Sequence, residues 1–239
     1  MKVLISGGEG LLATELIKCN PGHDIIAPSH TDMDITLYNN IFTICNEEKP
    51  DMIIHCAAMT HPMKNHYTYP EDSIQNNIIG TANIATACIR YGIKPVYIST
   101  DYVYKGDKDS NNSYKETDGV SPVDNYGWSK LGGECAINMV PKHLILRCCF
   151  TQRPFRHSKA FTDLYKSYMY VDEIAPIIWQ LIDRQCTGTY NVGGESSTVY
   201  DFAVKESPGI GRVTRDEVPE MVPYNTSMDV SKLSKELHD

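Results

Sequence analysis

The chain has 239 residues, within the range of one large domain, and 41% of them are hydrophobic while 22% are charged. This balance is typical of a globular protein and excludes a wholly disordered chain. The formal net charge of −8 and the absence of a long Lys/Arg run argue against electrostatic binding of nucleic acid or an anionic membrane. No apolar run approaches the length of a spanning helix, and glycines follow the first strand too early for a signal peptide, so we expect a cytoplasmic protein.

The predicted elements alternate between strand and helix through the first half of the chain. Short apolar runs predict strands, and amphipathic stretches predict helices. The expected strands are 2–6, 24–27, 51–56, 95–99 and 143–147. The expected helices are 10–19, 37–48, 71–91 and 125–138. The helix at 71–91 carries one apolar face formed by Ile74, Ile78, Ala82, Ala85 and Ile89. Nearly continuous apolar strands between helices predict an α/β fold, a Rossmann-like, doubly wound parallel sheet.

The second half is less regular. We expect a loop at 152–163, a helix at 171–183, a strand at 188–192, a short helix at 198–206, an edge strand at 212–218 and a last helix at 230–237. The expected organisation is a nucleotide-binding domain over 1–150 and a small C-terminal substrate-binding lobe over 151–239, with 170–192 returning to the main sheet.

The eight cysteines include no C-x-x-C pair and mostly lie in apolar stretches. We expect them to be reduced, buried hydrophobes, and we expect no metal site because the ligand spacing is missing.

A glycine-rich turn follows the first strand. Gly7 and Gly10, with Ala13 at the third position, fit G-x-x-G-x-x-[G/A] at the opening of the first helix. Gly7 allows the tight turn, and Gly10 allows the close approach of a pyrophosphate at the helix N-terminus, beside Leu11 and Leu12. The turn predicts dinucleotide binding.

The end of the second strand carries no acid at its tip for a ribose 2′-hydroxyl and no arginine for a 2′-phosphate. Ser29 and His30 stand near that position, so NADPH is slightly favoured over NADH. Asp34 and Ile35 follow and are expected beside the adenosine, although Asp34 also fits a helix N-terminus.

Tyr126 and Lys130 form a Y-x-x-x-K pair, and Thr100 ends the fourth strand. At helical spacing the phenol and the ammonium share a face, and a nearby ammonium lowers a phenol pKa towards neutrality. Because ligands bind beyond the carboxyl ends of parallel strands, Thr100 is expected in the same crevice. We expect Thr100 to polarise a carbonyl, Tyr126 to donate the proton, Lys130 to hold the ribose, and a nicotinamide to supply hydride.

These residues together resemble the extended short-chain dehydrogenase/reductases, and within them the dTDP-4-dehydrorhamnose reductase family of nucleotide-sugar 4-ketoreductases. The resemblance covers nearly the whole chain. Its further motifs are Asp34-Ile35-Thr36, His55-Cys56-Ala57-Ala58, Asn77-Ile78-Ile79-Gly80-Thr81, Ser99-Thr100-Asp101-Tyr102-Val103, Tyr170-Val171-Asp172-Glu173, Gly188-Thr189-Tyr190-Asn191-Val192-Gly193-Gly194 and Ser227-Met228-Asp229-Val230. Tyr102 stands where related 4,6-dehydratases carry a glutamate, which favours reduction over elimination.

The resemblance also implies site residues. Cys56, Ala57 and Ala58 would line the cofactor, and Asn77 would support the site. The substrate, a dTDP- or UDP-linked 4-keto-6-deoxy sugar, would contact Thr60, Asp101, Tyr102, Arg153 and Arg156. The last two belong to a basic loop that falls where the diphosphate lies in related enzymes, although a solvated loop is the alternative.

The chain departs from the family pattern where the stretch between Arg147 and Tyr170 is short, which suggests a trimmed substrate lobe. Two other functions stay open: an epimerase that retains NAD, and a non-catalytic binding subunit similar to the regulatory subunit of methionine adenosyltransferase. In related enzymes the helices that start near Glu71 and Asn125 often pair across a two-fold axis, so a homodimer is expected.

Overall fold

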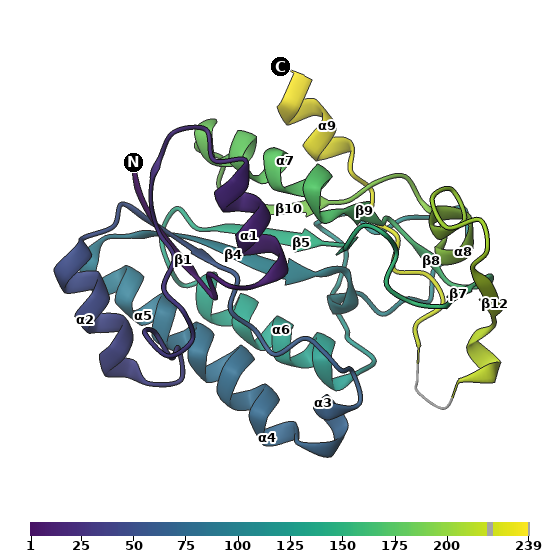
Figure 1. The fold of residues 1–239 in the computed structure, drawn as a ribbon, viewed down its shortest axis with the longest axis horizontal. Helices are drawn as coiled ribbons and strands as arrows, with labels where there is room; N and C mark the ends of the chain where they lie inside the picture. Colours follow the sequence, from purple (N-terminus) through teal and green to yellow (C-terminus); the bar gives the residue numbers. More distant parts are fainter. Residues whose placement is uncertain (219–221, 239) are drawn as a thin grey trace.

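The computed structural model describes residues 1–218 and 222–238 and has a six-stranded parallel sheet at its centre (Figure 1). The strand order is β10-β5-β4-β3-β1-β2. The strands are β1 (Lys2–Ser6), β2 (Asp24–Ile26), β3 (Met52–His55), β4 (Lys94–Thr100), β5 (Leu144–Cys148) and β10 (Gly188–Val192). Most residues of these strands are fully buried because helices cover both faces, which explains their continuous apolar sequences. The predicted α/β class and parallel sheet are confirmed.

Two layers of helices enclose the sheet (Figure 1). One hydrophobic core joins the first face of the sheet to α1 (Leu11–Lys18), α7 (Val171–Asp183) and α9 (Ser231–His238). A second core joins the opposite face to α2 (Tyr38–Glu48), α5 (Thr81–Tyr91) and α6 (Asn125–Ile137). The strand order reverses at β1, which has β2 on one side and β3 on the other. In open parallel sheets this switch point is where ligands bind, beyond the carboxyl ends of the strands.

The helix expected at 71–91 is interrupted in its first half. It consists of α4 (Pro70–Ser73), a π-helical segment η1 (Ile74–Gly80) and α5. The predicted apolar face is wrong at its ends, since Ile74 and Ile89 are 48% and 55% exposed. The wider π turn rotates the chain, and the buried side chains become Asn77, Thr81, Ile84, Ala85 and Cys88.

The C-terminal lobe is built from short pieces at the right of Figure 1. They are β6 (Phe150–Thr151), β7 (Lys159–Phe161), β8 (Tyr165–Lys166), β9 (Met169–Tyr170), β11 (Ser197–Thr198), α8 (Val199–Ala203), β12 (Gly211–Val213) and η3 (Arg215–Glu217). The loop expected at 152–163 therefore contains β7, and the edge strand expected at 212–218 is shorter and pairs with β7 instead of the main sheet. This pairing joins segments about 50 residues apart, which local periodicity cannot reveal. The division into two domains stays a prediction.

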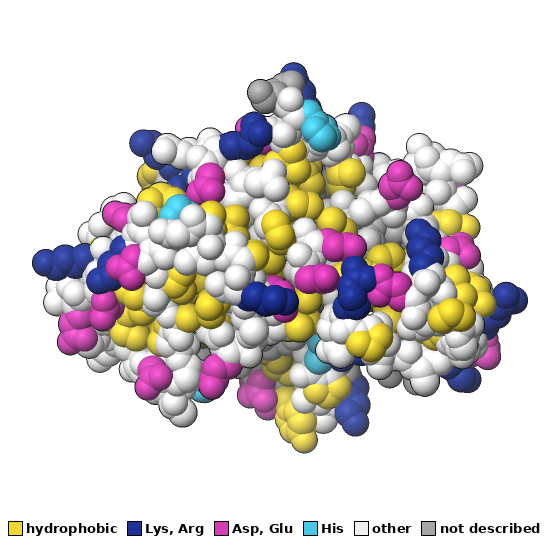
Figure 2. Space-filling model, turned by 45° about the horizontal axis from the view of Figure 1, so that its top comes forward, with side chains coloured by type: hydrophobic (Ala, Val, Ile, Leu, Met, Phe, Trp, Pro, Cys, Tyr) yellow, Lys and Arg dark blue, Asp and Glu magenta, His cyan; other side chains and the backbone are white. Residues whose placement is uncertain are grey.

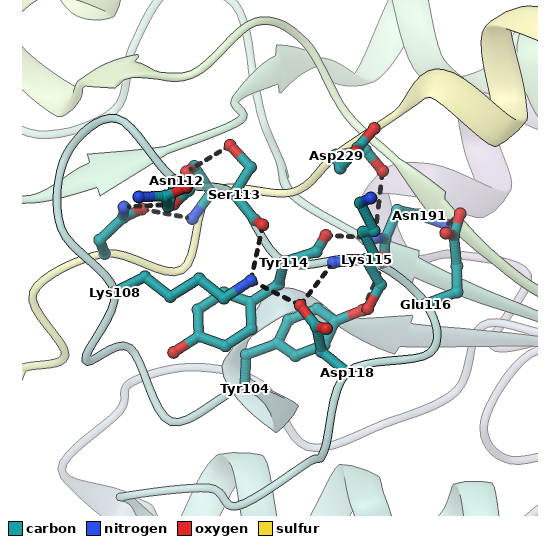
Figure 3. A network of polar contacts seen from close by, with 12 residues as sticks. Tyr104, Lys108, Asn112, Ser113, Tyr114, Lys115, Glu116, Asp118, Asn191 and Asp229 are labelled. Atoms are coloured by element: carbon teal, nitrogen blue, oxygen red, sulfur yellow. Dashed lines mark hydrogen bonds and ion pairs between the residues drawn. The ribbon is translucent and has the colours of Figure 1, made fainter.

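A polar network attaches the loop after β4 to the C-terminal segment (Figure 3). Lys108 Nζ donates to Asp118 Oδ2 at 2.5 Å and to the Ser113 carbonyl at 2.8 Å. Asn191, at the end of β10, donates to the carbonyls of Tyr114 and Asp229. The loop, the sheet edge and the segment before α9 are thereby fixed beside the carboxyl ends of β4 and β5.

The surface mixes both signs of charge, and on the face shown in Figure 2 basic and acidic side chains are interspersed. Within residues 1–218 and 222–238, no helix combines the length and the apolar character that crossing a membrane requires.

Candidate active site

The glycine turn after β1 is closely packed on two sides. Gly7 has φ +69°, and a Cβ on it would lie 2.8 Å from the Cα of Ala57. A Cβ on Gly8 would lie 2.6 Å from the carbonyl oxygen of Ala27. The N–H of Gly10 donates to the Gly7 carbonyl at 2.9 Å and opens α1. The sequence motif assigned no packing role to Gly8. A glycine is required there because the backbone of Ala27, just after β2, leaves no room for a Cβ.

A cleft of about 400 Å³ lies over this turn. Its lining includes Gly7 and Gly10 from the turn, His30 and Ile35 from the segment after β2, and Cys56, Ala57 and Ala58 from the loop after β3; Glu9, Met33, Met59 and Asn76 complete it. The cleft spans the switch point between β1 and β3, and its glycine floor leaves room for a pyrophosphate. Leu12 packs into the core below, whereas Leu11 is 44% exposed.

The segment after β2 has a polar turn that the strand-tip argument missed. Asp32 returns to the start of the segment, where its Oδ2 accepts hydrogen bonds from the Ser29 hydroxyl at 2.6 Å and from the Ser29 N–H at 3.3 Å. A carboxylate thus lies beside Ser29. Asp34 accepts from the N–H and hydroxyl of Thr36, both at 2.8 Å, which contributes to a pKa below that of an ordinary aspartate.

Hydrogen bonds of the Asn77 side chain connect the loop after β3 to α6. Its amide donates to the carbonyl of Met59 at 2.9 Å and to the Ser129 hydroxyl at 2.8 Å, and its carbonyl oxygen accepts from the Met59 N–H at 2.8 Å. Asn77 lies in the π-helical segment and is fully buried. Thr60 follows in the same loop, where it is exposed and its carbonyl accepts from His66.

Thr100 and Tyr126 meet beyond the carboxyl end of β4. Thr100 caps the 3₁₀ turn η2 (Asp101–Val103), and Tyr126 lies in the first turn of α6, whose N-cap is Asp124. The Thr100 hydroxyl lies close enough to the Tyr126 phenol to lower the pKa of that phenol. The structure therefore brings together the hydroxyl and phenol that the sequence placed in one crevice.

Burial raises the pKa of Tyr126 above the ordinary phenol range, more than the nearby Thr100 hydroxyl lowers it. The carboxylates of Asp101 and Asp124 raise this pKa further. The expected lowering by Lys130 is wrong, because the Lys130 ammonium lies over the ring of Tyr97. Tyr126 is therefore protonated at neutral pH, the state that a proton donor needs.

Lys130 is buried on the sheet side of α6, with 3% of its surface exposed. Burial lowers the pKa of Lys130 to about 8, against the opposing effects of Cys56 and Glu134. The Glu134 carboxylate accepts hydrogen bonds from Arg147 at 2.8 and 3.0 Å and from the Ser99 hydroxyl at 2.5 Å. Arg147 is thus a structural ion-pair partner of α6.

Asp101 and Tyr102, two of the expected substrate contacts, have protein partners. Asp101 is 2% exposed, and its carboxylate binds Lys166, Thr226 and Thr100. The ring of Tyr102 lies edge-on to that of Tyr126, with 5.8 Å between the centroids. Sequence reasoning missed Lys166, which follows Asp101 by 65 residues and carries no motif signal.

Arg153 and Arg156 differ in their surroundings. Arg153 forms ion pairs with Asp172, Glu173 and Glu206, and its guanidinium lies 3.8 Å from the centroid of the Tyr170 ring. Arg156 is exposed and lies near the loop after β3, since burial and the charges of Arg156 and His157 lower the pKa of His61 to about 4. Substrate contact by these residues stays a prediction.

Comparison with known proteins gives three informative relatives. A dTDP-4-dehydrorhamnose reductase of Aggregatibacter actinomycetemcomitans is 27% identical over 274 positions, covering 98% of this chain and 92% of the relative. That span exceeds the 239 residues of this chain, so at least 35 positions of the relative have no counterpart here. The methionine adenosyltransferase 2 subunit beta of Bos taurus is 32% identical, covering 84% of this chain and 70% of the relative.

The crystal structure of a dTDP-4-dehydrorhamnose reductase from Bacillus anthracis in complex with NADP superposes with a TM-score of 0.87. It is 27% identical, and the match covers 98% of this chain and 92% of that chain. The sequence also matches the family described as RmlD substrate binding domain over residues 1–234. The chain therefore belongs to the RmlD substrate binding domain family.

Proposed function

We propose that this protein reduces the keto group of a nucleotide-linked 4-keto-6-deoxy sugar, as a dTDP-4-dehydrorhamnose reductase does. The observation that carries the proposal is the proximity of the Thr100 hydroxyl to the Tyr126 phenol at the carboxyl end of β4. It lies beside strand β3, whose following loop lines the glycine-floored cleft. A reductase of this kind needs such a proton donor next to a nicotinamide.

The residues divide the work as follows. A bound nicotinamide supplies the hydride. Tyr126 gives its proton to the carbonyl oxygen, and its raised pKa keeps that proton available at neutral pH. Lys130 is the residue that binds the nicotinamide ribose in this proposal. Cys56, Ala57 and Ala58 form the wall of the cofactor cleft.

The proposed cofactor is NADPH or NADH. The relative from Bacillus anthracis was crystallised with NADP, which supports use of either form of the nicotinamide dinucleotide. Ser29 and His30 favour NADPH on sequence grounds, whereas the Asp32 carboxylate beside Ser29 opposes a 2′-phosphate. The proposed substrate carries a dTDP or UDP group, held in part by Arg156.

We also propose that the protein is a cytoplasmic homodimer. Exposed apolar side chains occur on α5, α6 and the segments adjoining them: Ile74 is 48% exposed, Ile89 55%, Trp128 54% and Met139 76%. The helices α5 and α6 contact each other, so one partner could cover both.

The test is turnover of a dTDP- or UDP-linked 4-keto-6-deoxy sugar. Turnover is measured as the loss of reduced-nicotinamide absorbance. Tyr126→Phe should lower kcat by about 10² to 10⁴ and leave the cofactor dissociation constant unchanged. Tyr69→Phe is the matched control, because Tyr69 is 50% exposed on the surface. Equal activity of Tyr126→Phe and the wild type would contradict the assignment of the proton donor.

Two experimental outcomes would contradict the proposed reductase function and favour another one. Protein that is purified with bound NAD and interconverts 4-hydroxyl epimers without added cofactor would be an epimerase. Protein that binds dinucleotide and sugar nucleotide without turnover would favour a binding role, the reading to which the similarity to the Bos taurus subunit points.

A further inference from the structure

A buried ion pair adjoins the reacting groups. Nζ of Lys166, in the lobe strand β8, lies 2.5 Å from Oδ2 of Asp101, and the two side chains are only 2% and 3% exposed. The Thr226 hydroxyl donates to the same oxygen at 2.5 Å, and Lys166 donates to the Thr226 oxygen at 3.2 Å. Removing two charges from water is unfavourable, so a buried pair by itself is weak evidence of a stabilising role. The position of this ion pair next to Thr100 indicates a functional role.

The second oxygen of Asp101 points to the site. Oδ1 accepts a hydrogen bond from the Thr100 hydroxyl at 3.2 Å, and the Tyr102 N–H donates to the same Thr100 oxygen at 3.2 Å. A hydroxyl has one proton and two lone pairs. When the Thr100 proton points to Asp101 and one lone pair accepts from Tyr102, one lone pair remains available to the nearby Tyr126 phenol.

Lys166 has a second contact with this group. Its ammonium lies 3.8 Å from the centroid of the Tyr102 ring, within the range of a cation–π interaction. The Tyr102 ring in turn packs edge-on against Tyr126. Lys166, from the lobe, therefore contacts both Asp101 and Tyr102, the two residues that pack against Thr100 and Tyr126.

We propose that Lys166 is a positioning residue for the proton transfer, a role that rests on the function proposed above. By binding Oδ2 of Asp101, Lys166 directs Oδ1 to Thr100, so that Thr100 accepts a hydrogen bond from Tyr126 before reaction. Tyr126 then gives its proton to the carbonyl oxygen while the carbonyl carbon receives hydride and the nicotinamide is oxidised. The Thr100 proton turns from Asp101 to the phenolate that remains.

The first experiment compares Lys166→Met with Lys108→Met. Lys108 also pairs with a carboxylate at 2.5 Å, that of Asp118, but in the loop network and at 29% side-chain exposure. Lys166→Met should lower kcat at least about tenfold and change the cofactor dissociation constant by less than about twofold. Lys108→Met should retain the wild-type kcat. A folded Lys166→Met variant with wild-type kcat would overturn the proposal.

A double-mutant cycle separates positioning from structural support. If Lys166 acts through Asp101, the kcat of Asp101→Asn should not fall further when Lys166→Met is added. Independent, additive losses would overturn the proposed route. The double variant carries no unpaired buried charge, so it also keeps the cycle informative if Lys166→Met alone does not fold.

A third measurement needs no substrate. The ¹³C resonance of the Tyr126 ring carbon Cζ, assigned with Tyr126→Phe, reports the hydrogen bonding of the phenol. It should shift in Lys166→Met and in the double variant, and it should stay in place in Lys108→Met. An unmoved resonance in folded Lys166→Met overturns the positioning role. Lack of turnover by the wild type together with a shifted resonance would reject only the proposed reaction.

Discussion

The ammonium of Lys130 lies 4.3 Å from the centroid of the Tyr97 ring, and both side chains are buried between β4 and α6. The Tyr97 hydroxyl donates to the backbone carbonyl of Lys130 at 3.2 Å, which joins the helix to the strand. An aromatic face attracts a cation but does not replace the water that burial removes. The pKa of Lys130 is therefore lowered, to about 8.

This lowered pKa predicts opposite responses of activity and stability to pH. Activity should fall above about pH 8, because Lys130 loses the charge that holds the ribose in the proposed function. Between about pH 8 and 10.4 the unfolded chain binds more protons at this lysine than the folded chain. The free energy of unfolding should therefore rise with pH across this window, by about 3 kcal/mol. Below it, the buried charge opposes folding.

The check is urea unfolding across this pH range for the wild type and Lys130→Met. The difference between the two curves isolates Lys130 from the other groups that titrate there. Parallel curves would show that Lys130 keeps an ordinary pKa.

The glycine turn supplies the second prediction. Gly10→Val would place a side chain where the pyrophosphate approaches, with its Cβ 3.1 Å from the Gly7 carbonyl oxygen. Dinucleotide affinity should fall at least about tenfold, roughly 1.4 kcal/mol. Gly119→Val is the control, since a Cβ there meets nothing within 4 Å. Titration calorimetry with NADH and NADPH measures both variants, and equal affinities would contradict a pyrophosphate at this turn.

The sheet and its glycine turn could be predicted from the sequence because their signals are local. Strands buried on both faces are continuous apolar runs, and the turn from β1 to α1 concentrates Gly7, Gly8 and Gly10 in four residues. The meeting of Thr100 and Tyr126 was also predictable, because the carboxyl ends of parallel strands share one edge of a sheet.

The remaining features depend on contacts between distant segments or on an altered helical period. The π-helical segment shifts the buried face of the helix around Asn77, which no α-helical pattern anticipates. Lys166 reaches Asp101 only because the lobe folds over β4. The Tyr126 pKa depends on burial, whereas the sequence shows only the spacing to Lys130.

The third prediction concerns cofactor preference. The Asp32 carboxylate accepts from Ser29, next to His30 in the cleft lining, and adds negative charge beside the two residues expected near a 2′-phosphate. Asp32→Asn should strengthen NADPH binding by about fivefold and leave NADH binding nearly unchanged. Asp24→Asn, at the amino end of β2, is the matched control. Equal changes for both cofactors would show that Asp32 does not distinguish them.

The fourth prediction concerns assembly. Trp128→Ser removes a large exposed apolar side chain from α6 and should convert a homodimer into a monomer, with little loss of unfolding free energy because Trp128 is 54% exposed. Leu37→Ser is the control, since Leu37 is 53% exposed just before α2. Light scattering at micromolar concentration measures the mass. A monomeric wild type would refute the dimer.

The last prediction separates the two arginines of the basic loop. Arg153 already has three carboxylate partners and the face of Tyr170, whereas Arg156 is exposed and lies close enough to His61 to affect its pKa. A diphosphate needs a guanidinium whose donors are available. Arg156→Ala should therefore raise the KM for the sugar nucleotide about tenfold with kcat unchanged. Arg153→Ala should change that KM by less than about twofold, since its guanidinium is already paired with protein carboxylates. Steady-state kinetics on both variants measure these KM values. A larger rise in KM for Arg153→Ala than for Arg156→Ala would place the diphosphate at Arg153.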